Sequence, residues 1–113
     1  MRDIEERGIG AVTREAMEVA WADTAGVYVT VDIDCLDGAF APGTCSPEPG
    51  GMTARELVGA LRIVGEHGFS AFDVAEVAPQ YDLGGITART AARVVLDLLA
   101  GRLAATLRDR RTE

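Results

Sequence analysis

The sequence predicts an α/β fold built around a parallel sheet, and two observations lead to this prediction. First, helical and strand-like patterns alternate along the 113 residues in the order helix, strand, helix, strand, helix. Such alternation is typical of parallel sheets joined by right-handed crossovers. Second, the first strand, 27–31, is apolar almost throughout, which favours a parallel strand covered on both faces. The length is that of one domain.

The first half of the chain supplies one helix, one strand and a long loop. A helix is predicted from Thr13 to Ala22, with Thr13 as its N-cap, and Gly26 ends this region. The β-branched and aromatic run 27–31 predicts the first strand. Residues 35–52 contain three of the four prolines and four glycines. A loop this long inside a compact domain is usually functional.

The second half repeats the helix and strand pattern. Thr53 and Glu56 form a capping-box sequence, and the helix they begin is expected to end near His67 and Gly68. A second strand is predicted over 69–77. Thr87 is expected to open a last helix, whose apolar stripe comprises Val94, Val95, Leu98, Leu99 and Leu103. Two apolar strands alone would leave both sheet edges open. We therefore infer that the chain is part of a larger sheet or pairs with another chain.

Composition excludes several classes of function. The net charge is −7, with eleven arginines and no lysine, which disfavours nucleic-acid binding. No apolar run approaches the roughly 18 residues of a membrane span. The charged start, residues 1–10, lacks the apolar core of a secretory signal. These features predict a soluble, cytoplasmic protein, in which Cys35 and Cys45 are two free thiols.

Two aspartates at the end of the first strand are the strongest candidates for chemistry. Asp32 and Asp34 are two residues apart, so strand alternation would point both to one side at the carboxyl end of the strand. Their oxygens suit Mg²⁺ or Mn²⁺, and Asp37 could support the following loop. The alternative is that the aspartates only tie down loop backbone. A metal-dependent phosphotransferase is a further alternative, disfavoured because Cys35 and Leu36 follow where that pattern has Gly-Thr.

Two longer motifs make a family resemblance specific. Residues 32–44 read D-I-D-C-L-D-G-A-F-A-P-G-T, residues 47–51 read P-E-P-G-G, and residues 73–79 read D-V-A-E-V-A-P. Their order and spacing resemble those of the motifs of the ureohydrolase (arginase/agmatinase) family, and their residues are nearer to those of agmatinase-like members. Gly38 stands where the family usually has Pro, and Cys45 and Ser46 replace a more common Gly-Thr. These departures lie in the loop, where they would alter substrate contacts more than metal binding.

The resemblance implies a fold and an activity. The fold would be the C-terminal part of a three-layer α/β/α arginase-like parallel sheet, with residues 1–113 forming a partial ureohydrolase domain. The activity would be hydrolysis of a guanidino compound, agmatine-like, to urea and an amine, as in polyamine metabolism. It implies a dinuclear Mn²⁺ centre in which Asp32 bridges both ions and Asp34 binds one, with Glu76 facing the substrate guanidinium. The full-length parent is expected to be a homo-oligomer.

Several family features are missing from this sequence. The G-G-D-H and D-A-H-x-D motifs are absent, and the only histidine, His67, is expected to be a surface or C-capping residue. We therefore expect an incomplete metal site and an isolated chain that is inactive and poorly soluble. The alternative is a non-catalytic truncated remnant or association module, which upstream coding sequence would distinguish.

Overall fold

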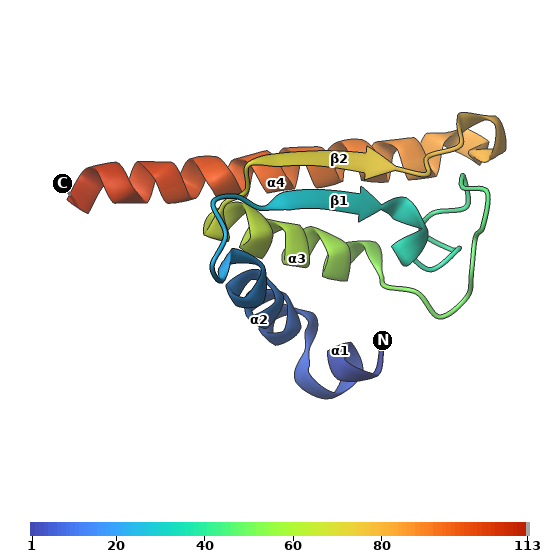
Figure 1. Ribbon diagram of the computed structural model, residues 1–113. Coiled ribbons are helices and arrows are strands. Elements are labelled where there is room, and N and C mark those ends of the chain that lie inside the picture. Colours follow the sequence, from blue (N-terminus) through green and yellow to red (C-terminus); the bar gives the residue numbers. More distant parts are fainter. Residues whose placement is uncertain (113) are drawn as a thin grey trace.

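The computed structural model describes residues 1–112, with side chains as far as Arg111. Helices and strands alternate as predicted, so the α/β class is confirmed (Figure 1). The elements are α1 (Arg2–Arg7), α2 (Ile9–Trp21), β1 (Tyr28–Asp32), α3 (Ala54–His67), β2 (Ala71–Ala75) and α4 (Ile86–Thr112). Short 3₁₀ turns lie at Ile33–Cys35, Pro79–Tyr81 and Leu83–Gly85. Helix α1 was not predicted.

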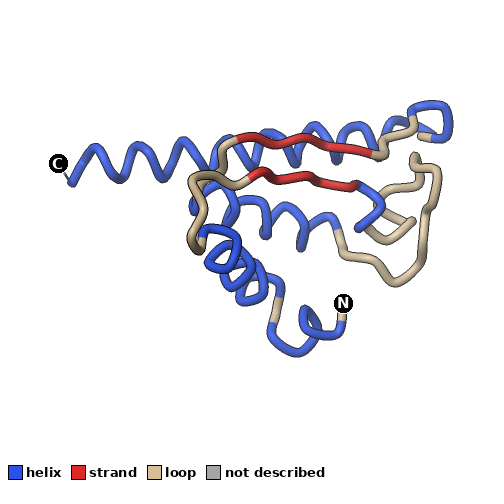
Figure 2. Tube along the Cα trace, viewed as in Figure 1, coloured by secondary structure: helices blue, strands red, loops and turns tan. Residues whose placement is uncertain are grey.

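The two strands form a parallel pair, as predicted. Their register runs from Tyr28 opposite Ala71 to Asp32 opposite Ala75. The two arrows point the same way in Figure 1, and Figure 2 shows the two strands side by side. The expectation that β1 is covered on both faces is wrong for residues 1–111. Val31 is 4% exposed whereas Tyr28 is 61% exposed, so the side chains of β1 alternate between a packed face and an open one.

Thr13 is not the N-cap of a helix, because α2 begins four residues earlier, at Ile9. The Thr13 side chain is buried, and its hydroxyl donates a hydrogen bond of 2.7 Å to the Ile9 carbonyl oxygen. A threonine inside a helix can satisfy its hydroxyl in this way. The residue before the helix is Gly8, whose φ is 79°.

The predicted capping box of α3 is confirmed. The Thr53 hydroxyl accepts from the Glu56 amide at 3.2 Å, and the Glu56 carboxylate accepts from the Thr53 amide at 2.7 Å. His67 is the last residue of α3, is exposed, and lies with Nδ1 2.9 Å from the Ile63 carbonyl oxygen. Gly68 follows with a φ of 92°, as expected for the residue that ends the helix.

Helices α3 and α4 pack with their backbones in close approach. A Cβ atom on Gly65 would lie 2.3 Å from the Leu98 carbonyl oxygen, and one on Gly101 would lie 2.6 Å from the Arg62 carbonyl oxygen. Only glycine permits this distance. The core combines residues of β1, the following turn, α3 and α4: Val31, Ile33, Leu36, Leu57, Leu61, Val94 and Leu98.

The predicted apolar stripe of α4 is partly wrong. Val94 and Leu98 are fully buried, but Leu99 and Leu103 are 46% and 60% exposed. Leu96 and Leu107, on the same helix, are also exposed. Tertiary packing therefore covers a narrower strip of α4 than the apolar sequence suggests. Among the helices of residues 1–112, none is long and apolar enough to cross a membrane.

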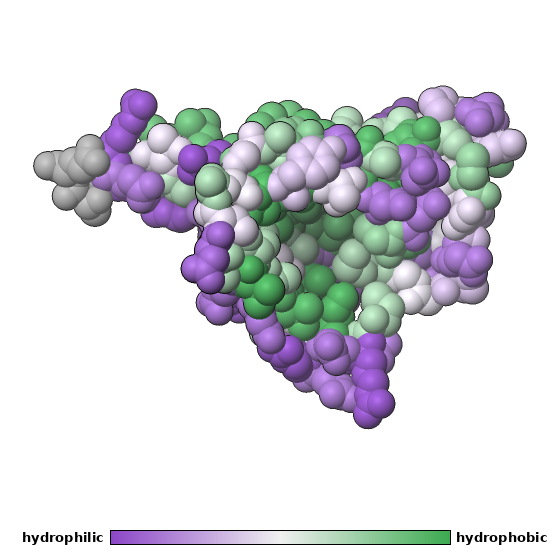
Figure 3. Space-filling view, in the orientation of Figure 1, coloured by the Kyte–Doolittle hydropathy of each residue, from purple (hydrophilic) through white to green (hydrophobic). Residues whose placement is uncertain are grey.

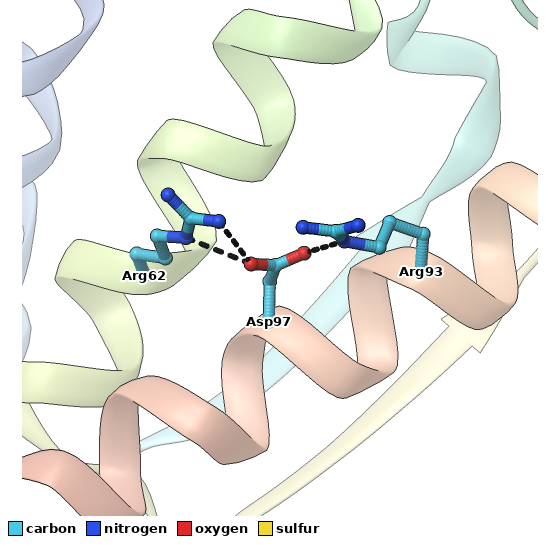
Figure 4. Close-up of polar contacts among 3 residues, drawn as sticks. All are labelled: Arg62, Arg93 and Asp97. Atoms are coloured by element: carbon cyan, nitrogen blue, oxygen red, sulfur yellow. Dashed lines mark hydrogen bonds and ion pairs between the residues drawn. The ribbon is translucent and has the colours of Figure 1, made fainter.

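One buried carboxylate joins α3 to α4. Asp97 is 5% exposed, and its Oδ1 accepts from Arg62 Nε at 2.7 Å while its Oδ2 is bonded to Arg93 Nε (Figure 4). The hydrogen bond from Arg93 comes first, then the hydrogen bond from Arg62 and the positive charges of both arginines, and together they hold the pKa of Asp97 below its usual value. The two arginines thus neutralise the buried Asp97 carboxylate where α3 and α4 meet.

Candidate functional site

Asp32 and Asp34 lie at the carboxyl end of β1, but not as two strand residues. Asp32 is the last residue of the strand, and Asp34 belongs to the 3₁₀ turn Ile33–Cys35. The Asp34 amide donates to Asp32 Oδ1 at 2.9 Å, which closes the turn directly after the strand. The expectation that both aspartates are strand residues is therefore wrong, because the strand ends at Asp32 and Asp34 belongs to the turn that follows.

One oxygen of this pair lacks a partner. Asp34 Oδ1 is buried and has no hydrogen-bond partner among the described residues. A buried carboxylate oxygen left unpaired is costly, and such an atom in a folded protein points to an additional group that satisfies it. The Asp32 carboxylate is already engaged on Oδ1 and remains exposed. The two carboxylates are hard oxygen donors suited to a divalent cation.

Asp37 organises the loop that follows. Its Oδ1 accepts from the Ala39 amide at 2.9 Å and its Oδ2 accepts from the Gly50 amide at 2.8 Å. These backbone donors hold the pKa of the Asp37 carboxyl below its usual value. The Asp37 amide also donates to the Met52 carbonyl at 2.9 Å, which ties the end of the loop to its beginning. Asp37 thus supports the loop, as expected.

The two cysteines, Cys35 and Cys45, are thiols of different exposure. Both are free, as predicted, and Cys45 is exposed. Burial, together with the nearby charge of Asp32, raises the pKa of the Cys35 thiol to about 11. Cys35 is therefore a neutral thiol at neutral pH and behaves as a small apolar residue.

Glu76 lies at the same end of the sheet as Asp32. Asp32 is opposite Ala75 in the register, and Glu76 is the next residue of the chain. Its side chain is exposed, and its backbone φ is 68°, in the left-handed region. A non-glycine residue in this conformation is uncommon, and such conformations cluster at functional sites. Nothing in the sequence predicted this conformation.

Asp73, which opens the second motif, serves the strand pair. Its carboxylate accepts from the hydroxyl of Tyr28 and, at 2.8 Å, from that of Thr30. These hydroxyls hold the pKa of the Asp73 carboxyl below its usual value. In the sequence, the signal for this contact is limited to the two hydroxyl-bearing residues of the neighbouring strand, Tyr28 and Thr30. The contact helps to hold β2 against β1.

A hollow lies between β1 and α3. Apolar side chains including Val31, Leu57 and Leu61 line it, Asp32 borders it, and its volume is about 320 Å³. The green hollow in Figure 3 shows the apolar character of this side of the molecule. A second hollow lies between α1 and α2 and contains no motif residue.

The described residues do not assemble a complete metal site. Within residues 1–111, no group of three or more His, Cys, Asp or Glu side chains is placed to hold one ion. Asp32 and Asp34 remain a pair, and His67 lies at the far end of α3. A second buried polar atom that has no hydrogen-bond partner in the described part of the chain, Thr44 Oγ1, lies in the loop and was not predicted.

Comparison with known proteins agrees with this arrangement. Residues 1–101 match the Arginase family. The chain is 53% identical over 73 residues to proclavaminate amidinohydrolase of Streptomyces clavuligerus, covering 65% of this chain and 23% of that protein. It is 42% identical over 96 residues to an agmatinase of Chromobacterium violaceum, covering 85% of this chain and 29% of that protein.

Solved structures give the same result. The formimidoylglutamase of Bacillus subtilis superposes with a TM-score of 0.86 at 31% identity, over 90% of this chain and 32% of that one. The Streptomyces clavuligerus enzyme superposes with a TM-score of 0.81 at 42% identity, over 92% and 34%. The chain thus spans about a third or less of the length of these relatives. By sequence and fold, the chain belongs to the arginase family.

Proposed function

We propose that this chain forms part of a metal-dependent enzyme that hydrolyses a guanidino compound to urea and an amine. The observation that carries the proposal is the buried, unpaired Asp34 Oδ1 beside Asp32, within the motif 32–44. Because the chain spans only part of its relatives, the activity is proposed for a full-length parent, and the 113-residue chain alone is expected to be inactive. A cytoplasmic homo-oligomer is proposed for that parent.

Asp32 and Asp34 are the proposed metal ligands. Their donor chemistry fits Mn²⁺, and the unpaired Asp34 oxygen gives a coordinating atom that folding has already desolvated. When bound, a metal pair lowers the pKa of a coordinated water so that hydrolysis proceeds near neutral pH. Two carboxylates are too few for a closed site, so additional ligands would have to come from outside the described residues.

Glu76 is proposed to bind the substrate guanidinium. Its carboxylate is exposed at the same end of the sheet as Asp32, and a carboxylate can accept two parallel N–H bonds from a planar guanidinium. An exposed glutamate held in a left-handed backbone conformation is consistent with a positioned binding group.

An agmatine-like substrate is the preferred choice. Agmatinases recur among the relatives, and another is named an amidinohydrolase. The acidic charge of the chain, −7, also favours a cationic substrate such as a guanidino amine. With this substrate, the proposed role of the parent enzyme is in polyamine metabolism.

The test is a Mn²⁺ titration by calorimetry on the purified chain. Wild type is compared with Asp32→Ala, Asp34→Asn and the matched surface control Glu18→Gln, an exposed carboxylate on α2. We expect weak Mn²⁺ binding that disappears in both aspartate variants and persists in Glu18→Gln, with no urea release from agmatine. Binding that is unchanged in both aspartate variants would refute the proposed ligands. Urea release by the purified chain would refute its expected inactivity.

A further inference from the structure

Gly43 connects the loop after β1 to the segment after β2. The Ala78 amide donates to the Gly43 carbonyl oxygen at 2.8 Å, and the Gly43 amide donates to the Thr87 hydroxyl oxygen at 2.7 Å. Gly43 and Thr87 are both buried, and Thr87 is 0% exposed. A Cβ on Gly43 would lie 2.3 Å from the Asp82 Cβ, so only glycine fits at this crossing. One glycine thus bonds to two residues that follow β2, Ala78 and Thr87.

Asp82 holds Thr87, the residue whose hydroxyl accepts the hydrogen bond from the Gly43 amide. Its Oδ1 accepts from the Thr87 amide and its Oδ2 accepts from the Ala88 amide, each at 2.9 Å. These donors, the Ala88 amide first, hold the pKa of the Asp82 carboxyl below its usual value. Asp82 therefore caps the first turn of α4 and orients Thr87, whose hydroxyl meets Gly43. The sequence predicted Thr87 as a helix start but gave no role to its hydroxyl.

The consequence falls on Glu76, which lies between two anchored residues. On one side, Ala75 ends β2 opposite Asp32. On the other side, Ala78 is bonded to Gly43. The partners of these two residues, Asp32 and Gly43, both belong to the segment 32–43, which also carries Asp34. A left-handed φ of 68° at a glutamate is unfavourable and persists only where surrounding contacts impose it. The bond between the Ala78 amide and the Gly43 carbonyl lies two residues after Glu76.

We propose that Thr87 and Asp82 are positioning residues that, through Gly43, hold Glu76 in its left-handed conformation beside the Asp32–Asp34 turn. The proposal rests on the proposed function, in which Glu76 binds the guanidinium. It adds that the distance between the substrate-binding carboxylate and the metal-binding carboxylates is set from the N-terminus of α4. Neither positioning residue is among the proposed metal ligands, Asp32 and Asp34, or is the proposed guanidinium-binding residue, Glu76.

The test compares Thr87→Val with Thr87→Ser in the full 113-residue chain, by nuclear magnetic resonance. Valine keeps the volume of threonine but removes the hydroxyl that accepts from Gly43, whereas serine retains it. Thr90→Val is the matched control, because the Thr90 hydroxyl lies one turn along the same helix and, among the described residues, bonds only to the Ile86 carbonyl. The readouts are the ¹³Cα and ¹³Cβ shifts of Glu76, which report its backbone conformation, and amide hydrogen exchange at Gly43 and Ala78.

In Thr87→Val we expect exchange at Gly43 and Ala78 to accelerate by about tenfold, as for loss of a buried hydrogen bond. The Glu76 shifts should move toward those of an ordinary extended residue. Thr87→Ser and Thr90→Val should match wild type. Unchanged Glu76 shifts in Thr87→Val, or an equal change in Thr90→Val, would overturn the proposal. If Thr87→Val does not fold, Asp82→Asn is judged by the same two readouts and the same criterion.

Adding Mn²⁺ to the same samples separates this proposal from the proposed function. Paramagnetic broadening of the Asp34 and Leu36 amides reports the metal ligands in every variant. Its absence would count against the metal site, while the Glu76 shifts would still decide the positioning role. Where broadening occurs, it should extend to the Glu76 amide in wild type and weaken there by severalfold in Thr87→Val. Equal broadening of Glu76 in both proteins would overturn the positioning role.

Discussion

The contact between α3 and α4 allows a quantitative test of how Asp97 contributes to stability. The Asp97 side chain is 6% exposed, whereas the side chains of Arg62 and Arg93 are 54% and 60% exposed. Removing both guanidinium groups would therefore strand a buried carboxylate, which costs about 3 kcal/mol at the lower end of values for broken buried pairs. Removing Asp97 instead leaves two arginines that can reach water, at a cost of about 1 kcal/mol.

The assay is urea denaturation followed by circular dichroism on four proteins. These are wild type, Asp97→Ala, the double variant Arg62→Gln/Arg93→Gln, and the triple variant combining all three changes. We expect the free energy of unfolding to fall by about 1 kcal/mol in Asp97→Ala and by about 3 kcal/mol in the double variant. The triple variant should recover part of the loss, because it no longer buries an unpaired charge. A triple variant no more stable than the double variant would refute this reasoning.

The same carboxyl gives a pH dependence of defined sign. Because the folded pKa of Asp97 is lowered, the folded state binds fewer protons than the unfolded state near the usual Asp pKa of about 3.9. Its stabilising contribution is complete above that pH and is lost as the pH falls through the lowered value. Wild type should therefore lose stability below about pH 4 more steeply than Asp97→Ala. Parallel acid-denaturation curves for the two proteins would contradict this assignment.

Two further predictions test the packing of α3 and α4 by thermal or urea denaturation. Leu98→Ala should lower the free energy of unfolding by about 2–5 kcal/mol because Leu98 is fully buried, while the adjacent Leu99→Ala, at a 46% exposed position, should change it by less than about 1 kcal/mol. Similar losses in both would contradict the observed strip of burial. Gly65→Ala should destabilise the chain by about 1–3 kcal/mol, since its Cβ would meet backbone 2.3 Å away. Gly59→Ala on the same helix, where a Cβ meets nothing within 4 Å, should instead stabilise the chain by about 0.5–1 kcal/mol. A stable Gly65→Ala variant would show that the helices separate at little cost.

Local patterns predicted local structure well, with some exceptions. The Thr53–Glu56 capping box is confirmed because both partners lie within one helical turn and need no distant contact. Thr13 was wrongly assigned as an N-cap from the same kind of local pattern, because the helix begins four residues before it, at Ile9. The expectation that Asp32 and Asp34 are both strand residues was wrong, because the strand ends at Asp32 and the Asp34 amide bonds to the Asp32 carboxylate in the following turn. Short-range competition between strand and turn is not visible in residue alternation.

The candidate site divides in the same way. The motifs identified Asp32, Asp34 and Glu76 as residues of interest and Asp37 as a support for the loop, and the structure places Asp32 and Glu76 at one end of the sheet. The metal-binding and substrate-binding roles remain predictions. The contacts of Gly43 with Ala78 and Thr87 were not predicted. Ala78 lies 35 residues after Gly43 and Thr87 lies 44 residues after it, and contacts over such separations leave no periodic signal in the sequence.

By itself, the sequence determined the helix and strand order from α2 onward, the parallel α/β class and the arginase-family membership, because all three follow from local apolar patterns and from the motif sequences. Only the tertiary structure decided which face of each element is covered. Leu98 and Leu99 are equally apolar neighbours, yet one is buried by α3 and the other is exposed. It also decided the left-handed backbone of Glu76, whose φ of 68° no sequence pattern predicted. Burial and backbone conformation at such points are set by the sum of long-range contacts, which no short stretch of sequence contains.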